Sequence, residues 1–170
     1  MPKNEIEILL VEDHPDDVEL TLQAFRKNNL ANRVHVARDG EEALDFLYCR
    51  GQYKERWSDR PPRLVLLDLK LPKVDGLEVL RILKADAVLR MIPVVVMTSS
   101  SEQRDVVEGY RLGVNSYIQK PVSFERFQEI VAQLGFYWLA VNEGVPPDAY
   151  VRGANPPHDA GKGTSLPWPS

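Results

Sequence analysis

The 170-residue chain has little of what marks secreted, membrane or nucleic-acid-binding proteins. Its single cysteine, Cys49, cannot form an internal disulfide and sits in an apolar helical pattern, where we expect it to pack. The longest hydrophobic runs are only strand-sized, and the first residues lack the basic-then-apolar order of a signal peptide. A net charge of −4 leaves no basic excess for nucleic acid or an anionic membrane surface. We therefore expect a cytoplasmic protein that binds neither nucleic acid nor membranes.

Short apolar runs alternate with helical periodicity along most of the chain. The runs EIEILLV, RVHVA, LVLLD, IPVVVMT and SYI have strand length, and each precedes an amphipathic helical pattern. Pro15 is a favoured first helical residue, and a second helix begins near Asp39. Five strand-helix units in series predict an α/β fold with a doubly wound parallel sheet. The helical patterns carry Val18, Leu22 and Phe25; Ala43, Leu44 and Leu47, an expected inner face; Leu77, Leu80 and Leu83; Val106, Val107 and Tyr110; and Phe127, Ile130, Val131, Leu134 and Trp138, an expected inner stripe.

Polar residues follow the apolar runs at the points where the predicted strands end. They are Glu12 and Asp13, then Asp68, Thr98 and Lys120. The carboxyl ends of parallel strands share one edge of the sheet, and ligands bind there at the point where strand order reverses. The strand order 2-1-3-4-5 places that point between the first and third strands, beside all three acids.

Three carboxylates held together repel one another unless they share a cation. An oxygen-rich site that keeps several waters suits Mg²⁺ and leaves room for a phosphoryl oxygen. The formal charges of the acids, a divalent ion and Lys120 then nearly cancel. Such an edge could receive a dianionic phosphoryl group.

Four segments carry a family resemblance: LLVEDHPDD, LLDLKLPKVDG, VVMTSS and YIQKP. In order and spacing they look like the receiver domain of two-component response regulators, over residues from about Ile6 to about Leu139. The resemblance implies a flavodoxin-like receiver fold and a phosphoacceptor without a DNA-binding output domain, for which 170 residues leave no room. It also implies a sensor histidine kinase as the partner that phosphorylates Asp68.

The resemblance further implies a role for each site residue. The metal, Mg²⁺ with Mn²⁺ as an alternative, would be held by Glu12, Asp13, Asp68 and the backbone carbonyl of Lys70. Thr98 and Lys120 would bind the phosphoryl group, Thr98 and Tyr117 would act as switch residues, and the Lys120–Pro121 bond would be cis. Lys70 and Ser100 would control dephosphorylation, and a charged lysine beside a small serine predicts slow loss of phosphate.

Two segments depart from a minimal receiver. The first, residues 51–63, is a loop at the amino end of the sheet, opposite the acids; with its Tyr53 and Trp57 and the later FYWL segment, it resembles receivers that partner bacterial phytochromes. A bacteriophytochrome is then the expected kinase, although a solvated loop with a folded-back tryptophan is the alternative. The second is a Pro/Gly-rich tail, residues 144–170, expected to be extended. The receiver domain would thus span residues 1–143.

Two other functions compete with the receiver interpretation. Aspartate-nucleophile phosphatases also use Asp, Mg²⁺, a hydroxyl and a lysine, but they resemble D-x-D, and here Lys70 replaces the second acid. A phosphate-independent scaffold would not need all of the polar residues at the sheet edge. We also expect a homodimer through the fourth helix, fifth strand and fifth helix, because the aromatic residues Tyr110, Phe136 and Tyr137 could form a partner surface.

Overall fold

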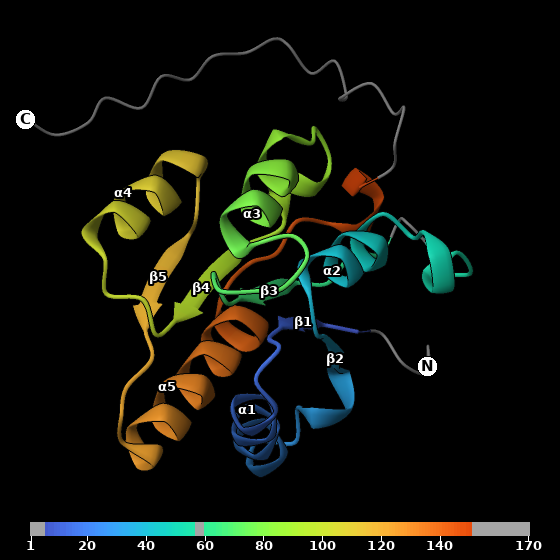
Figure 1. Ribbon diagram of the computed structural model, residues 1–170. Helices are drawn as coiled ribbons and strands as arrows, with labels where there is room; N and C mark the ends of the chain where they lie inside the picture. The colour runs from blue at the N-terminus through green and yellow to red at the C-terminus, as the bar shows by residue number, and fades with distance from the viewer. Residues whose placement is uncertain (1–5, 57–59, 151–170) are drawn as a thin grey trace, which may run out of the picture.

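The computed structural model describes residues 6–56 and 60–150. Five strands alternate with five α-helices along the chain (Figure 1). The strands are β1 (Ile8–Val11), β2 (Val34–Ala37), β3 (Leu64–Leu67), β4 (Val94–Thr98) and β5 (Ser116–Gln119). The helices are α1 (Pro15–Lys27), α2 (Gly40–Leu47), α3 (Gly76–Ala85), α4 (Gln103–Leu112) and α5 (Phe124–Phe136).

All strand pairs are parallel, and the sheet order is β2-β1-β3-β4-β5. This confirms the predicted doubly wound topology. Val11 of β1 pairs in register with Leu67 of β3, so the residues that follow both strands leave the sheet side by side. The predicted switch point therefore lies between β1 and β3.

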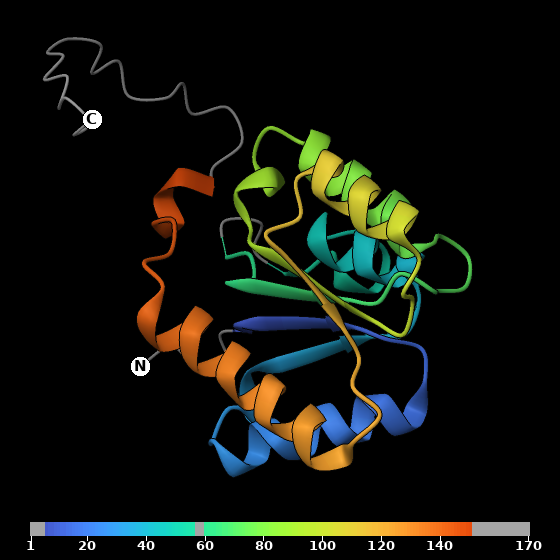
Figure 2. The same ribbon diagram turned by 90° about the vertical axis from the view of Figure 1, so that its left-hand side faces the viewer.

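Both faces of the sheet are covered, α1 and α5 on one and α2, α3 and α4 on the other (Figures 1 and 2). The central strands are buried on both faces, as their continuous apolar runs require. Alternate residues of β1 show the division: Leu9 and Val11 pack toward α2 and α3, whereas Ile8 and Leu10 pack toward α1 and α5. These two hydrophobic cores fix the edge of the sheet on which the polar residues sit.

Helix α4 packs on the sheet through a glycine and not through its apolar residues. Val107 and Tyr110 are about half exposed, and Gly109 is the buried residue of this helix. A Cβ on Gly109 would lie 3.4 Å from the ring of Tyr117, so the helix meets β5 through backbone instead of an apolar stripe. The apolar residues Val107 and Tyr110 therefore stay on the surface of α4.

The insertion lies at the amino end of the sheet, as predicted. The backbone N–H of Arg63 donates to the carbonyl of Glu7, which precedes β1. A 3₁₀ turn, Gly51–Tyr53, places the Tyr53 hydroxyl 2.6 Å from Glu42 and 2.9 Å from the ring of His35. Trp57, which the sequence analysis singled out, lies outside the described residues. Cys49 was expected to lie in a helix, but it follows the end of α2 in a left-handed conformation (φ 54°).

The start of the tail differs from the expected extended chain. Pro147–Tyr150 form a 3₁₀ helix, and Tyr150 is buried in the core between the sheet and helices α2 and α3. The chain reaches that position by crossing the amino edge of the sheet after α5 (Figure 2). Residues 151–170 lie outside the described part. Across the described residues, no helix is both long and apolar enough to span a membrane.

Candidate phosphoacceptor site

The predicted site residues meet at the carboxyl edge of the sheet. Glu12 and Asp13 follow β1, Asp68 follows β3, Thr98 ends β4 and Lys120 follows β5. The backbone N–H of Asp68 donates to the carbonyl of Val11, so the two acidic strand ends are hydrogen-bonded to each other. The order of the strands thus brings together residues more than a hundred positions apart.

The loop after Asp68 is held by a close backbone approach. A Cβ on Gly76, the first residue of α3, would lie 2.2 Å from the carbonyl oxygen of Asp68. Only glycine permits that contact. Asp75 caps the helix by accepting from the backbone N–H of Glu78, which places the start of α3 against the loop.

Three acids form the cluster that the sequence predicted. One carboxylate oxygen each from Glu12, Asp13 and Asp68 lies within 4.8 Å of the others. Asp13 is exposed, whereas Glu12 and Asp68 are buried. Oxygen donors with one side open to solvent fit a hard divalent cation such as Mg²⁺. The predicted metal ligand at Lys70 is its backbone carbonyl. The contact that the structure gives is made by its backbone N–H, which donates to Asp68 Oδ1 at 3.2 Å.

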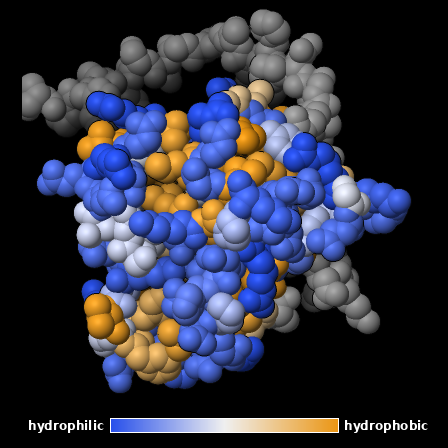
Figure 3. Space-filling model, viewed as in Figure 1, coloured by the Kyte–Doolittle hydropathy of each residue, from blue (hydrophilic) through white to orange (hydrophobic). Residues whose placement is uncertain are grey.

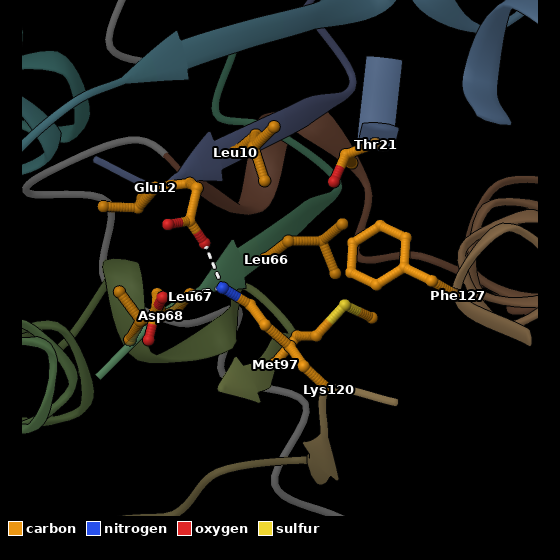
Figure 4. Close-up of a pocket in the computed structure, with 10 residues that line it drawn as sticks. Leu10, Glu12, Thr21, Leu66, Leu67, Asp68, Met97, Lys120 and Phe127 are labelled. Atoms are coloured by element: carbon orange, nitrogen blue, oxygen red, sulfur yellow. Dashed lines mark hydrogen bonds and ion pairs between the residues drawn. The ribbon is translucent and has the colours of Figure 1, made fainter. Parts of the chain in front are cut away.

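Lys120 projects into the acids from β5 (Figure 4). Its Nζ donates to Glu12 Oε2 at 2.7 Å, Asp17 Oδ2 at 2.7 Å and Asp68 Oδ2 at 2.9 Å. An ammonium has three protons, so these acceptors use all of its donors. The side chain is only 11% exposed and lines a small cavity of about 10 Å³, with Met97 and Phe127 among the neighbouring residues.

Asp17 is the site residue that the sequence analysis missed. It lies in the first turn of α1, where an acid is favoured by the positive end of the helix dipole. No local pattern marked its role, because its partner Lys120 is 103 positions away.

The expected cis Lys120–Pro121 bond is not found, since no peptide bond in the described chain is cis. The amine reaches the acids nonetheless. The backbone N–H of Lys120 donates to the Thr98 carbonyl at 2.7 Å, which continues the pairing of β5 with β4 to the edge of the site.

The pKa values of the two buried acids are shifted in opposite directions. Burial, with the nearby charge of Asp68, raises the pKa of Glu12 to about 7 against the opposing effect of Lys120. Burial acts in the same sense on Asp68, but its hydrogen bonds to Lys120 and to the Lys70 N–H outweigh burial and lower its pKa. Burial would lower the pKa of Lys120, yet its bonds to Asp17, Asp68 and Glu12 raise it. Asp68 is therefore ionised and Lys120 remains a cation.

The predicted switch residues already point inward. Thr98 is fully buried and its Oγ1 donates to Asp68 Oδ1 at 2.9 Å. The Tyr117 hydroxyl donates to the backbone carbonyl of Ser100 at 3.3 Å. Ser100 is itself buried, and its hydroxyl donates to Asp105 at 2.5 Å, so this side chain is tied to the first turn of α4.

A doubly wound sheet with an acid triad, a hydroxyl and a lysine at its switch point defines a signalling receiver. The chain belongs to the response regulator receiver domain family, whose model matches residues 8–132. Members of this family are the phosphoacceptors of two-component signalling, a non-enzymatic role.

Individual relatives extend the match over most of the chain. The probable methanogenesis regulatory protein FilR2 of Methanothrix harundinacea is 44% identical over 140 residues, which cover 82% of this chain and 88% of that protein. The structure of the Mn²⁺-bound form of response regulator Rcp1 has 36% identity and a TM-score of 0.76, covering 82% of this chain and 98% of that one. The bacteriophytochrome response regulator AtBRR has 54% identity and a TM-score of 0.62, covering 80% and 96%.

Proposed function

We propose that Asp68 accepts a phosphoryl group from a phosphohistidine of a sensor histidine kinase. The observation that carries this proposal is that different groups hold the two carboxylate oxygens of Asp68. Thr98 and the Lys70 N–H bind Oδ1, whereas Lys120 binds Oδ2. A carboxylate held in this way attacks phosphorus, the P–N bond to histidine breaks, a P–O bond to Asp68 forms, and the imidazole leaves with the bonding electron pair.

Mg²⁺, or Mn²⁺ in its place, is the cofactor that the donor set fits. Glu12, Asp13 and Asp68 would hold it, with the backbone carbonyl of Lys70 as a further ligand. When bound, such an ion neutralises charge on the transferring phosphoryl group. Support comes from the all-oxygen acid cluster and from a relative, Rcp1, whose structure is described as Mn²⁺-bound.

Thr98 and Lys120 would bind the phosphoryl oxygens. Phosphorylation adds about one negative charge and new acceptor oxygens at Asp68. The Thr98 hydroxyl and the Lys120 amine now donate to the oxygens of Asp68 and can donate to the phosphoryl group instead. Movement of Thr98 would be coupled to Tyr117, whose hydroxyl is bonded to the β4–α4 loop at Ser100. This pair is our proposed switch.

Lys70 and Ser100 would govern how long the phosphate persists. Lys70 is exposed beside Asp68 and has donors but no acceptor to orient an attacking water. Ser100 is buried and its hydroxyl is bonded to Asp105, so it offers little to such a water. We propose slow dephosphorylation.

A bacteriophytochrome is the proposed kinase. Two similar structures are described as the cyanobacterial phytochrome response regulator RcpA and the bacteriophytochrome response regulator AtBRR, with 38% and 54% identity to this chain. We place the exchange in the cytoplasm because sensor kinases draw phosphate from ATP. The receiver would occupy residues 1–143, including the inserted loop 51–63, and be followed by the tail 144–170.

We also propose a homodimer through the α4–β5–α5 face. Exposed hydrophobic residues on these elements and the segments that flank them are Val107, Tyr110, Val122, Phe124, Phe136, Tyr137 and Val141. Hydrophobic side chains also gather on the visible face, near its upper part and at its lower left edge (Figure 3). Apolar surface of this kind on a small domain is typical of an interface.

Incubation with acetyl phosphate and Mg²⁺, followed by intact mass measurement, tests the proposal. A receiver gains one phosphoryl group that persists. Continuous turnover of the donor without a persisting adduct would indicate a phosphatase instead, and no reaction would indicate a scaffold. We expect the single persisting adduct, because Lys70 stands where a phosphatase has its general acid.

A further inference from the structure

Asp17 contacts Lys120 as closely as Glu12 and Asp68 of the acid cluster do. Its Oδ2 lies 2.7 Å from Lys120 Nζ, the same distance as Glu12 Oε2. The first turn of α1 holds Asp17 in place, because Thr21, itself buried, donates its hydroxyl to the Asp17 carbonyl at 2.7 Å. The contact therefore joins the start of α1 to the end of β5.

The three acceptors of Lys120 differ in what else they do. Glu12 and Asp68 belong to the acid cluster that fits a divalent cation, and Asp68 is the proposed acceptor of phosphate. Their oxygens are therefore shared between the lysine and other partners. Asp17 is not a member of that cluster in the described chain, so its carboxylate can stay with Lys120 throughout.

We propose that Asp17 is a positioning residue that anchors the Lys120 ammonium for the phosphoryl group at Asp68. The inference rests on the proposed phosphoacceptor function. A lysine side chain has four rotatable carbon bonds, and a fixed acceptor reduces the conformations it samples. With one proton held by Asp17, the other two point to where Glu12 and Asp68 now accept.

Charge and hydrogen bonding at Asp17 can be separated by two substitutions. Asp17→Ala removes both the charge and the acceptor, whereas Asp17→Asn keeps an acceptor oxygen. Asp16→Ala is the matched control, because Asp16 is an exposed acid in the same helical turn. Thermal unfolding followed by circular dichroism verifies that each variant is folded.

The first readout is the rate of phosphorylation by acetyl phosphate in Mg²⁺. Asp17→Ala should slow it about tenfold, the equivalent of one hydrogen bond to a charged group. Asp17→Asn should recover most of the lost rate, and Asp16→Ala should match wild type. Equal rates for Asp17→Ala and Asp16→Ala would overturn the inference, as would an Asp17→Asn variant as slow as Asp17→Ala. A wild-type protein that accepts no phosphate would instead contradict the proposed function itself.

The second readout needs neither metal nor phosphate. The ¹⁵Nζ ammonium resonance of Lys120 in metal-free protein reports how well its three protons are protected from exchange. Asp17→Ala should broaden or remove this signal, while Asp16→Ala and Asp17→Asn should retain it. An unchanged Lys120 signal in Asp17→Ala would show that Glu12 and Asp68 suffice to hold the amine, which overturns the inference.

Discussion

Lys70 is exposed beside the carboxylate of Asp68, and its charge bears on the lifetime of a phosphoryl group there. Replacing it with asparagine removes the cation and adds an acceptor that can orient water. Lys70→Asn should therefore speed dephosphorylation on the order of tenfold, about 1.4 kcal/mol in activation free energy. Decay of the phosphorylated protein, followed by intact mass, measures the effect.

Lys73→Asn is the matched control for Lys70, because it makes the same charge change in the same loop. Lys73 has a positive φ of 64°, which asparagine tolerates, and it pairs with Asp39 away from Asp68. If both variants decay at the same rate as wild type, water reaches the phosphorus by a route that Lys70 does not control.

His35 gives the protein a pH-dependent stability. Its ring stacks on Phe46 at 4.4 Å and contacts the Tyr53 hydroxyl; burial lowers its pKa from 6.5, against the charge of Glu42 and together with that of Arg56. The unfolded chain thus binds a proton at a higher pH than the folded one. The stabilisation from neutral His35 is present above pH 6.5 and is lost as pH falls from that value to the lower pKa of the folded state.

His35→Phe keeps an aromatic ring on Phe46 but cannot titrate. Between pH 7.5 and pH 5.5, the midpoint of thermal unfolding should fall further in wild type than in this variant, because only wild type loses the stabilisation from neutral His35. Parallel curves for the two proteins would mean that His35 does not contribute.

Single residues also mark the limit of sequence reasoning. Glu12, Asp13, Asp68, Thr98 and Lys120 could all be placed because each follows an apolar run. The role of Asp17 could not, since its partner is 103 positions away and nothing local distinguishes it from other acids in a first helical turn.

At the scale of elements, the packing of α4 depends on a glycine, Gly109, which has no side chain. Gly109 faces the ring of Tyr117, and an added Cβ would make ordinary contact at 3.4 Å. Gly109→Ala should raise the free energy of unfolding by roughly 0.5–1 kcal/mol, because alanine restricts the unfolded chain and favours the helix. Urea denaturation measures this change.

Gly40→Ala is the contrasting variant for Gly109, because its Cβ would lie 1.9 Å from the Val74 carbonyl and must destabilise. Loss of stability in Gly109→Ala as well would show that Tyr117 cannot accommodate a methyl group.

The elements differ in how well the sequence predicted them. The apolar stripes of α2 and α3 were predicted correctly, because they bury against a sheet that is hydrophobic on both sides. For α4, the apolar residues did not show which face is buried, because a glycine contact takes the place of an apolar stripe, a tertiary effect that periodicity does not reveal. The turn at Pro147–Tyr150 was missed because one buried tyrosine, not a pattern, holds it.

At the scale of the whole molecule, the strand order followed from chemistry. Acids after the first and third strands become neighbours only if those strands are adjacent, as they are. The homodimer is a separate prediction, because it depends on the exposed hydrophobic residues of the α4–β5–α5 face and not on the residues between β1 and β3.

Tyr110→Glu, at an exposed residue near the C-terminal end of α4, should weaken self-association at least about tenfold. Sedimentation velocity at tens of micromolar, with and without phosphorylation, gives the measurement. Gln103→Glu is a control that makes the same charge change on the same helix at an exposed residue outside the hydrophobic set. A wild-type protein that is monomeric in both states would contradict the proposed dimer.

The most direct test of the account is the position of the phosphoryl group. Asp68→Asn keeps the shape of the side chain, but its amide is a poor nucleophile. After acetyl phosphate and Mg²⁺, wild type should gain one phosphoryl group that peptide mapping assigns to Asp68, and Asp68→Asn should gain none while remaining folded. Phosphorylation of Asp68→Asn at the wild-type rate would contradict the account, because another residue would then be the acceptor.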